Sequence, residues 1–155
     1  MTQNQHFIDG KFLVFDLNHE EYAIALGKVL EIVGAKGILD FDHEEPCLRG
    51  VISIRDQKVP VLDLRCRFGF EPRAKKEDSA VLITVFEPEL FKVGLVVDSV
   101  RQVMHIRTGI LEKPPTEKED TRAEFILVRV KVEGRTIMIL NSDKWGQYLR
   151  PLSSV

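Results

Sequence analysis

Cysteine is scarce in this sequence, which has two, Cys47 and Cys66, among 155 residues. They lie far apart and form no CxxC motif. No apolar run approaches the roughly 20 residues of a membrane span, and the first residues lack the basic start and apolar stretch of a signal peptide. We therefore expect a cytoplasmic protein with no direct membrane insertion. In that compartment we expect two reduced thiols, Cys47 in a loop and Cys66 on a short helix.

An excess of either charge is also absent, because 22 basic and 24 acidic residues leave a formal net charge of −2. This balance gives no indication of binding to nucleic acid or to an anionic membrane. One cluster of arginines, lysines and phenylalanines between Arg65 and Lys76 has a composition that can bind single-stranded nucleic acid. Glu71, Glu77 and Asp78 dilute its charge, so we interpret it as a solvated connection and expect no nucleic-acid partner.

Motifs for nucleotides, metals and acyl transfer are missing. The sequence contains neither GxxxxGK[ST] nor GxGxxG, it has no GxSxG, and its four histidines have no metal-site spacing. We therefore expect no cofactor. Asp16, Asp63 and Asp98 each lie near a predicted strand end, where two carboxylates could act as an acid/base pair in a small β-barrel hydrolase. A helix-capping role explains Asp63 and Asp98 more simply, so the protein is predicted not to be an enzyme.

Strand patterns dominate the chain. Runs rich in valine, isoleucine and phenylalanine come in pairs around short polar turns, which is typical of β-hairpins. The predicted strands are Lys11–Leu17 and Tyr22–Leu26, Val51–Ile54 and Val59–Leu62, Ala80–Phe86 and Lys92–Val97, and Phe125–Val132 and Thr136–Leu140. Short helical segments are predicted at Gly27–Val33, Leu64–Phe68 and Val100–Ile106, with a terminal helix from a cap at Asn141–Asp143 to Tyr148.

The chain carries a weak internal repeat. Ala23–Val29 lies 71 residues before Gly94–Val100, and both combine a small, apolar strand with a valine that opens the next segment. The hairpins that turn at Asp56 and at Gly134 are separated by 77–78 residues. The repeat predicts two small barrels, each of which is marginal alone, so we expect them to share a core. Each barrel would fill its own interior, and a second apolar layer would lie between them.

The hairpin Arg49–Leu64 combines apolar strands with a charged tip, Arg55–Lys58. Arginine has a planar fork of donors suited to carboxylates on a partner, and it is enriched at interface hot spots. Pro60 lacks a ladder donor, which favours an outward-facing edge or a bulge. We interpret the tip as a recognition surface for another protein, and the alternative is a solvated arginine with no partner.

The same hairpin resembles that of the CheW family, the coupling proteins of bacterial chemotaxis. Further matches are Phe12–Leu17 with Glu20–Ile24, Lys28–Gly34, Val93–Val103, and Gly134–Leu140 ahead of Asp143-Lys144. The resemblance implies an all-β fold of two intertwined five-stranded, SH3-like barrels that share a core, with short helices and a C-terminal helix. It implies one domain over residues 10–150, with a linker near 69–78, a second subdomain mainly at 79–140 with strand exchange, and flexible termini at 1–9 and 151–155.

The resemblance also implies a function. Members of this family are non-enzymatic adaptors that bind the cytoplasmic tip of chemoreceptors and the regulatory domain of a CheA-type histidine kinase. We therefore expect a scaffold that is monomeric when free and is recruited to membrane-associated receptor arrays. The alternative is a CheW-like adaptor in a non-flagellar chemosensory pathway that controls surface motility or gene expression.

The family motifs assign roles to particular positions. Receptor binding, in a groove between the barrels, falls to Val29, Glu31, Ile32, Val96, Val97 and Val100. Coupling to the kinase and the array falls to Gly50, Arg55, Asp56, Lys58 and Pro60. The chain departs from the family pattern at the hairpin turn, where Asp56 replaces the usual glycine, so the turn type and the direction of Arg55 remain open at this point.

Overall fold

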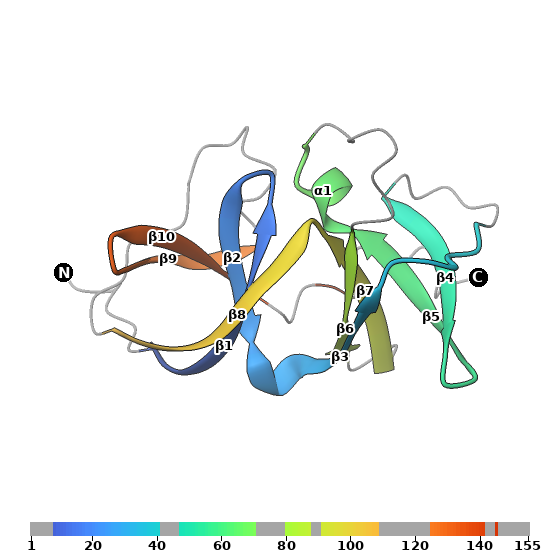
Figure 1. Cartoon of the computed structure of the whole chain (residues 1–155), viewed down its shortest axis with the longest axis horizontal. Coiled ribbons are helices and arrows are strands. Elements are labelled where there is room, and N and C mark those ends of the chain that lie inside the picture. Colours follow the sequence, from blue (N-terminus) through green and yellow to red (C-terminus); the bar gives the residue numbers. More distant parts are fainter. Residues whose placement is uncertain are drawn as a thin grey trace.

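The computed structural model describes residues 8–40, 47–70, 80–87, 91–108, 125–141 and 145. Within them the chain forms ten strands, one short α-helix and one 3-10 helix (Figure 1). In chain order these are β1 (Ile8–Leu17), β2 (Glu20–Ala25), η1 (Leu26–Lys28), β3 (Val29–Gly34), β4 (Leu48–Ile54), β5 (Gln57–Asp63), α1 (Leu64–Arg67), β6 (Val81–Glu87), β7 (Phe91–Val97), β8 (Ser99–Thr108), β9 (Ile126–Val132) and β10 (Arg135–Leu140). No helix among these residues is long and apolar enough to span a membrane.

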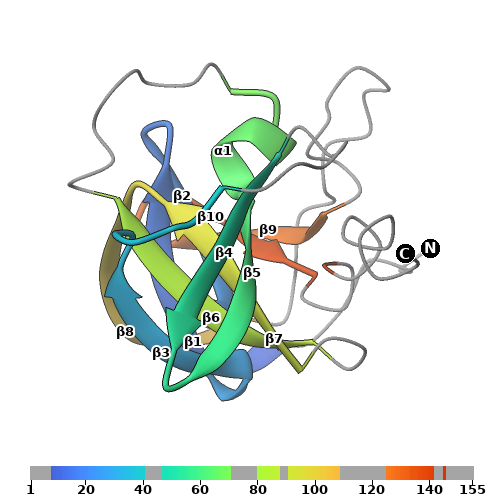
Figure 2. The same cartoon turned by 90° about the vertical axis from the view of Figure 1, so that its right-hand side faces the viewer.

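The strands form two five-stranded sheets that lie side by side (Figures 1 and 2). The first has the order β8-β1-β2-β10-β9, and the second has the order β3-β6-β7-β5-β4. β3 therefore leaves the first unit to become an edge strand of the second, and β8 makes the reverse exchange. The predicted architecture of two intertwined five-stranded units is confirmed.

The two sheets have equivalent topology, which confirms the internal repeat. In each sheet a hairpin pairs in parallel with a strand of another hairpin: β2 with β10, and β7 with β5. Ala23 pairs with Ile139 in the first sheet, and Gly94 pairs with Val61 in the second. These pairs are related by shifts of 71 and 78 residues, which are the offsets visible in the sequence.

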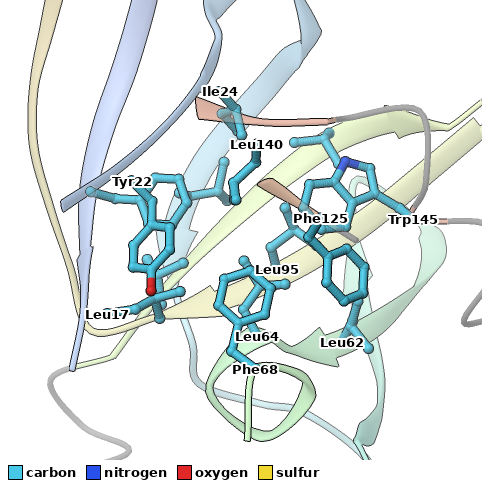
Figure 3. Close-up of a cluster of buried hydrophobic side chains, with 14 of the residues drawn as sticks. Leu17, Tyr22, Ile24, Leu62, Leu64, Phe68, Leu95, Phe125, Leu140 and Trp145 are labelled. Atoms are coloured by element: carbon cyan, nitrogen blue, oxygen red, sulfur yellow. The ribbon is translucent and has the colours of Figure 1, made fainter. Parts of the chain in front are cut away.

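Buried apolar side chains form three layers, as predicted. One cluster fills the first sheet's barrel and includes Val14, Ala23 and Ile137. A second fills the other barrel and includes Val61 and Leu82. The largest lies between the barrels and takes residues from both sheets, among them Leu17, Tyr22, Ile24, Leu62, Leu64, Phe68, Leu95, Phe125, Leu140 and Trp145 (Figure 3). Since each strand alternates its faces, one side of a strand serves its own barrel and the other serves this shared core.

Aromatic rings dominate the shared core. Tyr22 and Phe68 lie 5.4 Å apart between ring centroids, Phe68 and Phe125 lie 5.3 Å apart, and Phe125 stacks on Trp145 at 5.9 Å (Figure 3). The rings come from β2, from the end of α1 and from the C-terminal part of the chain. Burial of each such ring stabilises the fold by roughly 1.5–3 kcal/mol, so this row fixes the two barrels against each other.

Two of the predicted short helices are strands instead. Residues Gly27–Val33 form the end of η1 and most of β3, and Val100–Ile106 lie within β8. Their apolar spacing fits one or two helical turns, but both segments are rich in β-branched residues, which favour the pleated surface of a sheet. Each segment is also an edge strand that pairs with a neighbouring hairpin, β3 with β6 and β8 with β1. Long-range pairing therefore decides their structure.

Some predicted boundaries can be compared directly. Asp63 caps α1 as predicted, because its side chain accepts a hydrogen bond from the Arg65 backbone N–H. Asp98 caps no helix, since β8 begins at Ser99. β1 begins at Ile8, two residues before the expected domain start. Most of the expected linker and of the C-terminal helix lies outside the described residues.

Three hairpins turn through two residues that both have positive φ, the pattern of a type I′ turn. This turn matches the right-handed twist of paired strands, and it suits glycine, asparagine and aspartate. The turn residues and their φ values are Asn18 (50°) and His19 (68°), Arg55 (52°) and Asp56 (65°), and Glu133 (50°) and Gly134 (80°).

Candidate protein-binding surface

The tip of the β4–β5 hairpin projects at the end of the second barrel opposite α1 (Figures 1 and 2). Its type I′ turn has Arg55 as the first central residue and Asp56 as the second. Asp56 thus adopts the left-handed conformation in place of glycine, which answers the question of turn type. The Arg55 side chain is 76% exposed.

Arg55 contacts Glu31, which lies on β3. The Arg55 Nε atom lies 3.4 Å from Oε1 of Glu31, and Nη2 lies 3.4 Å from Oε2. The guanidinium therefore contacts both carboxylate oxygens. The Glu31 side chain is 26% exposed. Glu31 follows a bulge in the β3–β6 pairing, and its carbonyl accepts a hydrogen bond from the Thr84 hydroxyl. The structure thereby joins two residues to which the sequence assigned separate roles.

Gly50 lies in β4, away from the tip. Its φ is +140°, and a Cβ atom at this position would lie 2.1 Å from the Leu39 carbonyl oxygen. Leu39 crosses β4 here and exchanges two backbone hydrogen bonds with Val51, of 2.7 and 2.9 Å. Gly50 is therefore required for the close approach of the segment before the hairpin.

Lys58 and Pro60 lie on β5, opposite Ser53 and Val51. Lys58 is exposed, as expected for a tip residue. The expectation of an edge strand is wrong, because β5 lies between β4 and β7. The pairing with β7 begins at Val61, however, so Pro60 lies just outside that ladder and its missing N–H is needed by no β7 partner.

Three of the apolar positions predicted for a receptor, Val29, Ile32 and Val100, lie on the two exchanged strands, β3 and β8. Val29 and Val100 are partly buried and pack against the shared core. Ile32 is 45% exposed and pairs with the buried Ile83. Paired residues point to the same face of a sheet, so Ile32 lies on the side of the shared core, at its margin.

Val103 is the equivalent residue on β8, and the sequence reasoning missed it. It is 47% exposed and pairs with the buried Leu13, which belongs to the shared core. Strand alternation counted from Val100 does not reveal it, because Val103 lies three residues further on, and the register shift opposite Val14 and Phe15 brings both valines to the same face.

Val96 and Val97 do not lie on the surface. They are 1% and 0% exposed, and they belong to different buried clusters, Val96 to the second barrel and Val97 to the shared core. The reason is that β7 is a central strand with β6 on one side and β5 on the other. Neither valine offers a surface to a partner, which corrects their assignment to receptor binding.

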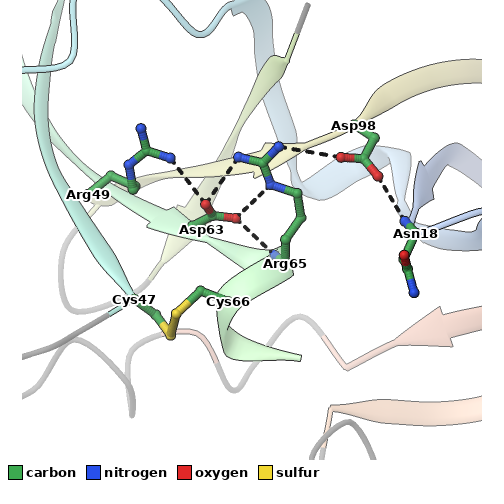
Figure 4. Close-up of polar contacts among 7 residues, drawn as sticks. All are labelled: Asn18, Cys47, Arg49, Asp63, Arg65, Cys66 and Asp98. Atoms are coloured by element: carbon green, nitrogen blue, oxygen red, sulfur yellow. Dashed lines mark hydrogen bonds and ion pairs between the residues drawn. A yellow bond between two sulfur atoms is a disulfide. The ribbon is translucent and has the colours of Figure 1, made fainter. Parts of the chain in front are cut away.

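A chain of polar contacts joins the two barrels near α1 (Figure 4). Arg65 makes two hydrogen bonds to the Asp63 carboxylate, of 3.0 and 3.1 Å, and reaches Asp98 at 3.4 Å. Asp98 in turn accepts a hydrogen bond of 2.8 Å from the Asn18 backbone N–H, in the turn of the first barrel. Burial lowers the pKa of Arg65, but hydrogen bonding and charge from Asp63 and Asp98 outweigh it and raise the pKa overall.

This arrangement bears on the three aspartates considered for catalysis. Asp63 and Asp98 do come together, but each is held by the Arg65 guanidinium, and Asp63 also contacts Arg49 at 3.2 Å. Asp16 is likewise engaged, by Arg101 at 2.7 Å and by the Ser99 hydroxyl at 2.8 Å. All three carboxylates are therefore engaged by donors within the protein. The geometry favours a structural role over a hydrolase site. We call the four residues that connect the barrels here, Asn18, Asp63, Arg65 and Asp98, the joint.

The two cysteines form a disulfide, with Cα atoms 5.3 Å apart. The prediction of two reduced thiols is therefore wrong for this structure, although Cys66 lies on the short helix as predicted. The pairing follows from the hairpin: the Asp63 N–H donates to the Cys47 carbonyl, so Cys47 lies opposite the residue that caps α1. The first turn of that helix then brings Cys66 back to Cys47. Among the described residues, no group of three metal-binding side chains converges.

Known proteins resemble the chain over most of its length. Residues 11–147 match the family described as the CheW-like domain. A chemotaxis protein CheW of Klebsiella aerogenes is 32% identical over 130 residues, which cover 84% of this chain and 76% of that protein. The CheW of Bacillus subtilis is 27% identical, covering 86% of this chain and 84% of the relative.

A solved structure agrees with these matches. The crystal structure of the scaffolding protein TtCheW from Thermoanaerobacter tengcongensis superimposes with a TM-score of 0.77 at 29% identity. The match covers 88% of this chain and 92% of that one. With two five-stranded sheets, a shared core and a family match across nearly all of its described strands, the chain belongs to the CheW family of chemotaxis coupling proteins.

Proposed function

We propose that this protein is a non-enzymatic, cytoplasmic adaptor that couples chemoreceptors to a CheA-type histidine kinase and is monomeric when free. Membership in the CheW family supports this role, as does the scaffolding function named for the solved relative. The relatives are named as chemotaxis proteins, which favours chemotaxis over another chemosensory pathway.

The receptor surface in this proposal consists of Val29, Ile32, Val100 and Val103. Ile32 and Val103 are 45% and 47% exposed. Val29 and Val100 are partly buried and pack against the shared core. Such a surface suits the apolar stripe of a receptor helix, because burial of both stripes removes apolar area from water. Glu31 lies among these positions on β3 and supplies a charge that can fix the register of the helix.

The kinase surface in this proposal is the tip of the β4–β5 hairpin, formed by Arg55, Asp56 and Lys58. These residues are exposed, and the two-residue turn holds them in a defined geometry. The kinase regulatory domain would meet this end of the second barrel. Complementary charges there would set orientation and the rate of association more than they set affinity.

The contact between Arg55 and Glu31 is the observation that carries the proposal. In this contact the tip proposed for the kinase lies against the strand proposed for the receptor, with 3.4 Å between Arg55 Nη2 and Glu31 Oε2. A receptor helix that engages Glu31 would change the partner available to Arg55. The adaptor would then connect its two partners through one ion pair.

Co-sedimentation with receptor-bearing membranes tests the proposal. The purified chain and CheA from the same organism are mixed with these membranes, and kinase autophosphorylation is assayed in the pellet. Wild type should carry the kinase down and activate it, and Arg55→Ala should do both poorly. Lys131→Ala, which removes an exposed cation from β9, is the matched control and should behave as wild type. If the kinase sediments equally well without the chain, the proposed coupling role is refuted.

The receptor surface has its own matched pair of variants. Ile32→Ser removes an exposed apolar side chain from β3, and Leu127→Ser removes one of similar exposure, 49%, from β9. Both should fold normally, since neither side chain is buried. Only Ile32→Ser should lose receptor binding when the kinase is left out of the mixture. Equal loss in both variants would show that β3 has no special role.

A further inference from the structure

The Cys47–Cys66 disulfide cross-links the base of the β4–β5 hairpin beside the polar chain that joins the barrels (Figure 4). Cys47 directly precedes β4, and Cys66 is the third residue of α1. Asp63 lies beside the disulfide, since its backbone N–H donates to the Cys47 carbonyl and its carboxylate accepts hydrogen bonds from the Arg65 side chain. The disulfide is therefore directly connected to the joint: Cys47 is hydrogen-bonded to Asp63, and Cys66 follows Arg65 in the chain.

The two cysteine residues differ in their exposure to solvent. Cys47 is 5% exposed and belongs to the shared apolar core. Cys66 is an exposed residue on α1. A thiol or disulfide in solution can therefore reach Cys66 directly, whereas it reaches Cys47 only through Cys66 or by local unfolding.

The helix does not depend on the cross-link alone for its position. Leu64 at its start is fully buried and Phe68 at its end is 3% exposed, both in the shared core. The Asp63 cap and the hydrogen bond from the Phe68 N–H to the Leu64 carbonyl hold the turn together. We therefore expect the protein to stay folded when the disulfide is reduced, with Cys66 exposed to solvent and Cys47 buried next to it.

We propose that Cys66 and Cys47 form a reversible thiol-exchange site, in which Cys66 is the attacking cysteine and Cys47 is the resolving one. In the reduced protein the Cys66 thiolate attacks a low-molecular-weight disulfide, forms a mixed disulfide and releases one thiolate. The Cys47 thiolate then attacks Sγ of Cys66, closes the internal disulfide and releases the second thiolate. Two protein thiols are oxidised, and one external disulfide is reduced to two thiols.

The reverse reaction uses a dithiol. One thiolate of the dithiol attacks Sγ of Cys66, and the electron pair of the broken bond leaves on Cys47, which takes up a proton. The second sulfur of the dithiol then displaces Cys66, so the dithiol is oxidised to its disulfide. The cycle switches the joint between a cross-linked state and an open state, because closure restrains the chain on both sides of Asp63.

Single-cysteine variants test the order of attack, with glutathione disulfide as the probe and mass spectrometry as the readout. Cys47→Ala retains the exposed thiol and should accumulate one glutathionyl group. Cys66→Ser retains the buried thiol, and its rate of glutathionylation should be lower than that of Cys47→Ala by a factor of about ten or more. Reduced wild type should pass through the mixed form and end as the internal disulfide with no added mass. Equal reaction rates in the two variants, or a mixed disulfide that persists in wild type, would overturn the proposal.

Hydrogen exchange and thermal unfolding test the effect on the joint. Dithiothreitol should lower the melting temperature of wild type by roughly 5–10 °C and speed exchange of the Phe68 and Asn18 amides. Amides of the β9–β10 hairpin should not change. The Cys47→Ala/Cys66→Ser double variant controls for the reagent and should not respond to it. If reduction of wild type changes neither the melting temperature nor the exchange rates of the Phe68 and Asn18 amides, the disulfide does not affect the joint.

Discussion

Arg55 and Glu31 lie 24 residues apart, on a hairpin turn and on a strand exchanged from the other barrel, and they face each other through two contacts of 3.4 Å. The distance is long for a strong hydrogen bond, and three quarters of the Arg55 side chain is exposed. Exposed pairs of this kind stabilise a fold by about 0.2–1 kcal/mol. The pair therefore has little effect on stability and is suited to orienting the two side chains.

A double-mutant cycle separates these two effects. Arg55→Ala and Glu31→Gln should each change the free energy of unfolding by less than about 1 kcal/mol, with a coupling energy of similar or smaller size. In partner-binding assays the two changes should be strongly non-additive, because either one breaks the same contact. Urea unfolding gives the first quantity and co-sedimentation gives the second. Loss of several kcal/mol of stability in Arg55→Ala would instead identify a structural residue.

The hairpin turns themselves give a reciprocal prediction. Asp56 and Gly134 occupy the same position of two equivalent type I′ turns, with φ of 65° and 80°. Glycine adopts this conformation without strain, whereas an L-residue pays a steric cost, which is reduced for aspartate. Asp56→Gly should therefore raise the free energy of unfolding by about 0.5–1 kcal/mol.

The matched change is Gly134→Asp, which places the same side chain in the same kind of turn. A Cβ atom at Gly134 would meet nothing within 4 Å, so only the backbone conformation opposes it. This variant should lose about as much stability as Asp56→Gly gains, as measured by urea unfolding. Changes of the same sign in the two variants would contradict the assignment of equivalent turns.

Gly50→Ala should be far more damaging. The added Cβ atom would lie 2.1 Å from the Leu39 carbonyl oxygen, at a backbone φ of +140° that alanine rarely adopts. Overpacking and backbone strain together should cost about 2–4 kcal/mol of unfolding free energy. Gly27→Ala is the control, because its Cβ atom would meet nothing within 4 Å. Thermal denaturation of the two variants should differ by many degrees, and similar melting temperatures would show that Leu39 does not cross β4 so closely.

Local patterns in the sequence were sufficient for the hairpins, the positions of their turns and the Asp63 cap. Each depends on residues close together in the chain, such as the strand alternation on either side of Arg55 and Asp56. The internal repeat was also visible, because the offsets of 71 and 78 residues recur in the pairing of Ala23 with Ile139 and of Gly94 with Val61.

Long-range strand pairing explains where the structure differs from the predictions made from the sequence. β3 and β8 are strands because neighbouring hairpins pair with them, and their own spacing fits a helix equally well. Val96 and Val97 are buried because β7 acquires neighbours on both sides, one of them from the preceding half of the chain. Cys47 meets Cys66 because the hairpin register and the start of α1 act together, which spacing in the sequence does not reveal.

The contact of His105 with Asp9, which ties β8 to β1, leads to a prediction about pH. Hydrogen bonding from His105 lowers the pKa of Asp9, opposed by slight desolvation and assisted by the charges of His105 and Arg107. A carboxyl whose pKa is lowered on folding contributes stability above its unfolded pKa of about 3.9. That contribution is lost as the pH falls through the lowered value.

His105→Ala should therefore return the pKa of Asp9 toward its usual range, and NMR titration of the Asp9 side-chain carboxyl carbon measures this directly. The melting temperature of the variant should be below that of wild type near neutral pH, and the difference should vanish in acid, once Asp9 is protonated in both proteins. Lys131→Ala removes a positive charge from β9 and should leave the Asp9 titration unchanged. A wild-type Asp9 that titrates at its unfolded value would show that the histidine contact is not maintained in solution. A difference in melting temperature that persists at low pH would assign the effect of His105 to packing on β8 and not to its bond with the carboxylate.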